Sequence, residues 1–127
     1  MRLNQVTVTV NELDAAIGFY GRLGLRLIVQ SADYARFECP DGESTFSVHL
    51  DREAKVDGNT TIYFEHDALD GLVISLKAKG LAFESDPVDQ RWLWREAYLR
   101  DPSGNRICLF QAGEARRYPP WRLKESK

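Results

Sequence analysis

The side chains best suited to chemistry in this sequence are one histidine and two glutamates on predicted strands, His49, Glu65 and Glu96. A histidine beside a carboxylate can transfer protons near neutral pH, because the imidazole titrates in that range. We therefore predict His49 and Glu65 as catalytic residues. Together with Gln5 they also form a candidate divalent-metal site, to which Glu96 is a further candidate carboxylate. The alternative is a hydrogen-bonded pair that orients a ligand or completes a pocket wall, and the sequence leaves it open.

Alternating apolar and polar residues predict the strands that carry these side chains. In 3–10 the valines at positions 6, 8 and 10 share one face, so Gln5 and Thr7 lie on the other. The same alternation places Ser47 on one face with His49. The predicted strands are 3–10, 25–30, 34–39, 45–50, 60–65 and 81–84, followed by a hairpin at 94–111.

Two helices are predicted between these strands. Apolar residues at helical spacing indicate one helix at 13–23, with Asn11 as its N-cap and Gly24 after its last turn. A second helix is predicted at 67–79, and Gly80 ends it in the same way.

The predicted elements repeat once along the chain. Leu13-Asp14 recurs as Leu69-Asp70, and the glycine after the first helix recurs after the second at the same spacing. Two copies indicate duplication of one βαβββ unit rather than a solenoid, which needs at least three repeats. We predict a single domain at 1–112, with module one at 3–50 and module two at 60–111. A tail at 113–127 is expected to dock through Trp121 on the body or on a partner subunit.

Composition limits the partners and the compartment. Seventeen basic and 19 acidic residues give a net charge of −2 over 127 residues, so no global field attracts nucleic acid. No apolar run approaches the length that crosses a membrane. The two cysteines, Cys39 and Cys108, lie far apart in sequence, which favours reduced thiols over a disulfide framework. We expect a cytoplasmic protein that binds neither nucleic acid nor membranes.

Three segments in a fixed order carry a family resemblance. They are the strand and helix at 3–25, the start of the second module at 63–70, and the turn Asp101-Pro-Ser-Gly-Asn105, in which Gly104 permits positive φ. Together they resemble the vicinal oxygen chelate superfamily, the glyoxalase/bleomycin resistance protein/dioxygenase group. The resemblance implies an α+β fold of two tandem βαβββ modules, forming curved mixed sheets around a concave cavity. By analogy it also implies a homodimer.

The resemblance assigns one face of each sheet to the cavity. Apolar residues such as Val8 and Ile107 are expected to pack under the helices on the opposite face. The cavity faces combine aromatic rings with a few polar groups, which is the composition of a pocket for a small-molecule ligand. The predicted substrate-binding residues are Gln5, Thr7, Ser47, Thr61, Tyr63, Trp94, Glu96, Tyr98, Cys108 and Phe110.

Metal-dependent relatives hold their ion on the first, fourth, fifth and eighth strands. The corresponding residues in this chain are Gln5, Ser47, Thr61 and Cys108. Of these, Gln5 alone keeps the pattern, because neutral hydroxyls bind metals poorly and a soft sulfur does not suit the hard ions of such sites. The cofactor is therefore unknown, and a divalent metal, displaced to Gln5, His49 and Glu65, is the less favoured outcome.

Two functions follow from the resemblance. One is a glyoxalase-like or dioxygenase-like enzyme, for example a lyase, that acts on a small organic substrate. The alternative is a non-catalytic protein of the bleomycin-resistance type, which binds and sequesters its ligand without metal. The incomplete ligand set favours sequestration, whereas His49 with Glu65 favours the enzyme, so the sequence leaves catalysis open.

Overall fold

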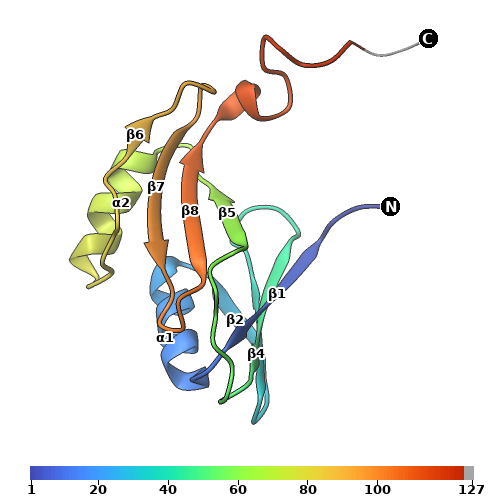
Figure 1. Ribbon diagram of the computed structural model, residues 1–127, viewed down its shortest axis with the longest axis vertical. Coiled ribbons are helices and arrows are strands. Elements are labelled where there is room, and N and C mark those ends of the chain that lie inside the picture. Colours follow the sequence, from blue (N-terminus) through green and yellow to red (C-terminus); the bar gives the residue numbers. More distant parts are fainter. Residues whose placement is uncertain (125–127) are drawn as a thin grey trace.

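The computed structural model describes residues 1–124, which form two four-stranded sheets with one helix against each (Figure 1). Module one consists of β1 (Gln5–Val10), α1 (Leu13–Leu23), β2 (Arg26–Gln30), β3 (Tyr34–Glu38) and β4 (Thr45–Leu50). Module two consists of β5 (Thr61–Glu65), α2 (Leu69–Ala78), β6 (Val88–Asp89), β7 (Arg95–Arg100) and β8 (Arg106–Gln111). The strand orders, β1-β4-β3-β2 and β5-β8-β7-β6, are the same in both modules. The predicted α+β fold of two βαβββ modules is confirmed, and the sheets stay separate.

The strand register aligns side chains in rows across each sheet. In both modules the first strand pairs parallel with the fourth, and the fourth pairs antiparallel with the third. Paired residues project to the same face, so each row is a set of neighbouring side chains. The central rows are Thr7, Ser47 and Arg36 in module one and Tyr63, Cys108 and Tyr98 in module two.

The helix-covered face of each sheet forms the core, as the alternation of apolar residues predicts. α1 and α2 contribute buried residues to one hydrophobic cluster that includes strands of both modules. Buried strand residues on this face are Val8, Phe46, Val48, Ile107 and Leu109, and Val6, Ile62 and Phe64 pack against them partly buried. Because these faces hold the fold together, the chemistry of the opposite faces is free to vary.

A buried hydrogen bond links the two modules. The hydroxyl of Tyr20 on α1 donates to Asp101 Oδ2 at 2.7 Å, in the turn between β7 and β8. Burial first, and then the Asp101 carboxylate, raise the pKa of Tyr20 well above its usual value. The side-chain amide of Asn105 donates to the Thr9 carbonyl at 2.8 Å nearby. The turn that carries the family resemblance therefore also joins module two to module one.

Two predicted details are wrong. Asn11 does not cap the first helix, because the N-cap is Glu12 and has no side-chain capping bond. Asn11 instead bonds the same turn of module two, where its backbone N–H donates to Ser103 Oγ at 2.9 Å. The segment 81–84 is not a strand, because the backbone N–H of Leu81 bonds back to the end of α2. The short edge strand is β6, which pairs with the start of β7.

The tail leaves the end of β8 and runs away from both sheets (Figure 1). Its first turn, η1 (Gly113–Arg116), is held by an ion pair between Arg116 and Glu65 at 3.4 Å. Trp121 remains 54% exposed, so its docking on a partner subunit stays a prediction. Residues 125–127 of the predicted tail lie outside the described residues. No helix in the described part of the chain is long and apolar enough to cross a membrane.

Candidate functional site

We call the face of each sheet that carries no helix its free face. The free faces hold nearly all the side chains that the sequence predicts as functional. On module one the residues are Gln5, Thr7, Tyr34, Arg36, Ser47 and His49, and on module two they are Thr61, Tyr63, Glu65, Glu96, Tyr98, Cys108 and Phe110.

Three aromatic rings gather on the free face of module two. Trp94, just before β7, stacks on Phe110 of β8 with ring centroids 4.5 Å apart and an interplanar angle of 20°. Tyr63 on β5 meets both rings edge-on, at 5.9 Å from Trp94 and 5.7 Å from Phe110. Tyr63 is 47% exposed, so one side of this group is open to a ligand. The three predicted residues therefore form a contiguous apolar wall.

Glu96 lies beside this wall as a buried carboxylate. The residue is 2% exposed, and its register partner on β8 is Phe110. Its Oε1 accepts a hydrogen bond from the Tyr98 hydroxyl at 2.7 Å, and its Oε2 accepts one from Trp92 Nε1–H at 2.8 Å. Each carboxyl oxygen of Glu96 therefore accepts one hydrogen bond from a neutral donor. Burial first, and then this bond to Glu96, raise the pKa of Tyr98.

Cys108 lies in the same row as Tyr98 and is fully buried. Burial, reinforced by the nearby Glu96 charge, raises the pKa of its thiol to about 12. Since the thiolate is the nucleophile, a thiol that stays protonated at neutral pH is a poor nucleophile. Cys108 therefore contributes shape to the site rather than reactivity.

The free face of module one has hydrogen-bonding groups in place of the aromatic wall. The hydroxyls of Thr7 and Ser47 bond each other, and Arg36 Nε–H donates to the Tyr34 hydroxyl at 2.9 Å. The pKa of Tyr34 is lowered, first because the Ser47 hydroxyl stabilises the phenolate and further because Arg36 is adjacent. Gln5 Oε1 accepts from the Thr45 hydroxyl at 2.8 Å.

The predicted catalytic and metal residues, by contrast, do not meet within the described chain. His49 pairs with Thr9, whereas Gln5 pairs with Thr45, four positions earlier on β4. Four residues along a strand span about 13 Å, too far for both side chains to hold one ion easily. Glu65 is paired with Arg116 instead, and within residues 1–124 no hydrogen bond or ion pair joins it to His49. Their joint role stays a prediction.

The positions that hold the ion in metal-dependent relatives do not fit a divalent ion here. Ser47 is fully buried and already bonded to Thr7. Thr61 Oγ1 faces the Arg106 guanidinium at 3.4 Å, so a positive charge already lies beside it. Cys108 would supply a soft sulfur, which does not suit the hard ions of such sites. Residues 1–124 contain no group of three His, Cys, Asp or Glu residues that could hold a metal ion.

The structure also adds four residues that the sequence-based set omits. Trp92, which bonds Glu96, is absent from that set because it lies in a loop, where periodicity does not predict the direction of a side chain. The Arg106 guanidinium lies over the Tyr98 ring, 4.4 Å from its centroid. Tyr34 and Arg36 were available from alternation, because the buried Ala35 and Phe37 between them identify the opposite face of β3.

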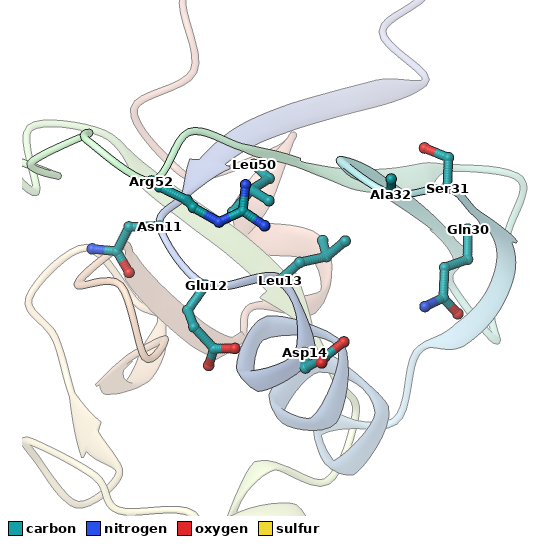
Figure 2. A pocket seen from close by; sticks show the side chains of 9 residues that line it. All are labelled: Asn11, Glu12, Leu13, Asp14, Gln30, Ser31, Ala32, Leu50 and Arg52. Atoms are coloured by element: carbon teal, nitrogen blue, oxygen red, sulfur yellow. The ribbon is translucent and has the colours of Figure 1, made fainter.

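Two surface hollows lie away from the predicted site residues. One, of about 270 Å³, lies between the start of α1, the turn after β2 and the end of β4, where Glu12, Asp14 and Arg52 border it (Figure 2). The other, of about 360 Å³, occupies the related position in module two, between Asp67, Arg95 and Gln111. Because both modules have a hollow at the start of the helix, we attribute it to the shared fold. The free faces therefore remain the candidate site.

Comparison with known proteins supports the family resemblance that the sequence indicates. A family model described as the Glyoxalase/Bleomycin resistance protein/Dioxygenase superfamily matches residues 2–109. None of the curated proteins matches the chain. A glyoxalase/bleomycin resistance protein/dioxygenase from Nocardioides is similar in structure, with a TM-score of 0.79 and 22% identity over 98% of this chain and 90% of that chain.

Two further solved structures carry more specific names. A lactoylglutathione lyase from Agrobacterium tumefaciens has a TM-score of 0.72 and 20% identity, covering 87% of this chain and 92% of that chain. A bleomycin resistance determinant encoded on the transposon Tn5 has a TM-score of 0.74 and 19% identity, covering 89% of this chain and 99% of that chain. At these identities the likeness shows the fold and leaves the chemistry to the site. On the family match and the shared fold, the chain belongs to the glyoxalase/bleomycin resistance protein/dioxygenase superfamily.

Proposed function

We propose that this protein binds a small organic molecule on its free faces, and that binding rather than turnover is its primary function. The observation that carries the proposal is the wall of Tyr63, Trp94 and Phe110, which is stacked and open on one side. Apolar walls with a few fixed polar groups are what small-molecule sites require. Glu96 and Tyr98 supply those groups next to the wall.

Some of these residues give the site its shape, and others can orient the ligand. The Trp94–Phe110 stack offers a flat surface against which a planar ligand can pack, because offset and edge-on ring contacts are favourable. On module one, the exposed Thr7 hydroxyl, which the buried Ser47 holds in place, and the Arg36 guanidinium can orient polar groups of the same or a second ligand. A fully protonated Cys108 thiol leaves the site without a nucleophile at that position.

A homodimer is part of this proposal. The two modules meet through their helix-covered faces, where Phe46 and Phe64 lie 5.7 Å apart, and the free faces carry separate sets of contacts. A second copy of the chain would supply an opposite wall to each free face, and Trp121 of the exposed tail would gain a docking site. Sedimentation at several protein concentrations tests this assembly. We further propose a cytoplasmic location with reduced thiols.

The rival function is a lyase-type or dioxygenase-type enzyme, and His49 is the observation that favours it. His49 is exposed on the free face of module one, next to Tyr34 and Thr9, where a substrate can reach it. If the protein is an enzyme, His49→Ala abolishes turnover or metal uptake while ligand binding at Trp94 persists. Stoichiometric metal in purified protein that His49→Ala removes would favour the enzyme over sequestration.

The binding proposal is tested with a thermal-shift screen of planar and carboxylated or aminated metabolites. A hit should be weakened by Trp94→Ala about fivefold or more, since stacking on an aromatic side chain is worth about 1 kcal/mol or more. Ile74→Ala is the control, because it removes a large apolar side chain that is exposed on α2, outside both free faces. A ligand that binds both variants with unchanged affinity would exclude the aromatic wall as its site.

A further inference from the structure

The buried carboxylate of Glu96 has no cationic partner. The residue is 2% exposed, and none of the ion pairs within residues 1–124 includes it. Its two hydrogen bonds come from neutral donors, the Tyr98 hydroxyl and the Trp92 indole N–H. An ionised group out of water is costly unless it is paired, because neutral donors replace only part of its hydration. Glu96 is therefore poised to accept a positive charge.

The two donors differ in how firmly they are held. Tyr98 belongs to β7, pairs with Cys108 on β8 and lies under the Arg106 guanidinium. Trp92 lies outside the sheet, in the turn that the Gln90 N–H to Trp94 carbonyl bond closes, and it is 38% exposed. Trp92 is thus the donor that can leave Glu96 without disturbing the sheet.

The turn that holds Trp92 over Glu96 is strained. Leu93 has a φ of 72°, and it is the one non-glycine residue with positive φ in the described chain. A left-handed conformation costs a residue with a β-carbon about 1–2 kcal/mol. Strain of this kind is found where a segment must change conformation or hold a functional group in place. Movement of Trp92 away from Glu96 can release it.

The surroundings of Glu96 suit an organic cation in particular. Phe110 is its neighbour across the sheet, and Phe110 stacks with Trp94, so aromatic rings lie next to the negative charge. Ring faces attract cations, and an adjacent carboxylate adds a charge-assisted hydrogen bond. Arg106 also lies nearby, but its guanidinium is placed over the ring of Tyr98 rather than against the Glu96 carboxylate.

We propose that Glu96 binds the protonated amine of an aromatic or otherwise apolar ligand, and that Trp92 is a replaceable cover that occupies Glu96 Oε2 when the site is empty. This inference rests on the proposed function, because it names the ligand class of the same site. The ligand amine replaces the Trp92 N–H as donor to Oε2, and its apolar part lies against Trp94 and Phe110.

The test compares three indoles that share ring and chain length but differ in charge. Tryptamine is the cation, tryptophol the neutral form and indole-3-acetate the anion, and each is titrated by calorimetry into the full-length protein. We expect tryptamine to bind about tenfold more tightly than tryptophol, because a charge-assisted hydrogen bond is stronger than a neutral one. Indole-3-acetate should bind most weakly, because its negative charge is repelled by the carboxylate.

Glu96→Gln is the decisive variant and keeps the local hydrogen bonds. Its amide oxygen can accept from Trp92 while its amide N–H donates to the Tyr98 hydroxyl oxygen, so the fold is retained. In this variant tryptamine and tryptophol should bind within about twofold of each other. Glu43→Gln, at an exposed site outside the free faces, is the control that should keep the wild-type ratio.

Trp92→Phe tests the cover. It removes the indole N–H but keeps a ring, so tryptamine should bind at least as tightly as in the wild type; weaker binding would overturn the cover. Equal affinity for tryptamine and tryptophol in the wild type, or a preference that survives Glu96→Gln, would overturn the charge site. If both indoles still weaken in Trp94→Ala, the proposed function stands. If none of the three indoles binds at concentrations up to about 10 mM, at which millimolar affinity is detectable, this inference is overturned but the proposed function is not.

Discussion

The hydrogen bond between Tyr20 and Asp101 predicts how strongly the two modules depend on each other. Tyr20→Phe removes one buried hydroxyl and leaves the ring contacts with Phe37 and Phe46 in place. Asp101 keeps three further donors, the backbone N–H groups of Ser103 and Asn105 and the Asn105 side-chain amide. A hydrogen bond to a charged group contributes about 1.5–3 kcal/mol, and the remaining donors place this one near the lower end, at about 2 kcal/mol.

Urea unfolding at fixed protein concentration measures the change, since a dimer would make stability depend on concentration. For a chain of 127 residues, a loss of about 2 kcal/mol lowers Tm by about 7 °C. Tyr118→Phe, on an exposed tail tyrosine, should change the unfolding free energy by less than about 0.5 kcal/mol.

A double-mutant cycle separates the bond itself from other effects of each substitution. Combining Tyr20→Phe with Asp101→Ala should give a coupling of about 1–2 kcal/mol, because the two groups share one buried contact. A coupling near zero would refute the argument, and so would a Tyr20→Phe variant as stable as the control. Either result would mean that this hydrogen bond adds nothing to the other contacts that hold the modules together.

Further outcomes follow from three single positions. Gly104→Ala should lower the unfolding free energy by about 1–2 kcal/mol in urea titrations, because Gly104 has a φ of 103°. Gly18→Ala, in the interior of α1 with open space around it, should raise it by about 0.5–1 kcal/mol. The Cys108 thiol should resist alkylation in the native protein up to pH 10, whereas the half-buried Cys39 reacts first. The free energy of unfolding should also fall as pH rises above 9, because the pKa of the Cys108 thiol is 9.0 in the unfolded chain and about 12 in the native protein. Cys108→Ala should reduce that loss in pH-dependent denaturation.

The fold was accessible from the sequence because its determinants are local and repeated. Alternation assigns the faces of strands such as β1 and β4, and the glycines after each helix mark where the helices end. The repeat then fixes the order of elements twice. Asn11 shows the limit of such prediction. The local sequence favours it as a helix cap, but in the structure it bonds Ser103, which is 92 residues away. No local pattern contains that contact.

The candidate site was accessible only in part, for a related reason. Membership of a free face follows from alternation, so Tyr63, Glu96 and Phe110 could be predicted one by one. Which of them touch depends on register and on side-chain direction. The bond from Trp92 to Glu96 depends on a loop with one left-handed residue, Leu93, and neither propensity nor periodicity predicts that conformation.

The duplication gives a further argument about where function resides. Equivalent rows of the two free faces hold Thr9, His49 and Tyr34 in module one but Glu65, Phe110 and Glu96 in module two. The helix-covered faces, by contrast, stayed apolar in both modules. Since the fold needs only the covered faces, it does not explain why this one row carries a histidine and two hydroxyl groups in module one but a phenylalanine and two glutamates in module two. A requirement of packing would act on both copies alike. We therefore propose that the divergence reflects different binding roles of the two faces, in which case a ligand that contacts both would present different chemistry to each.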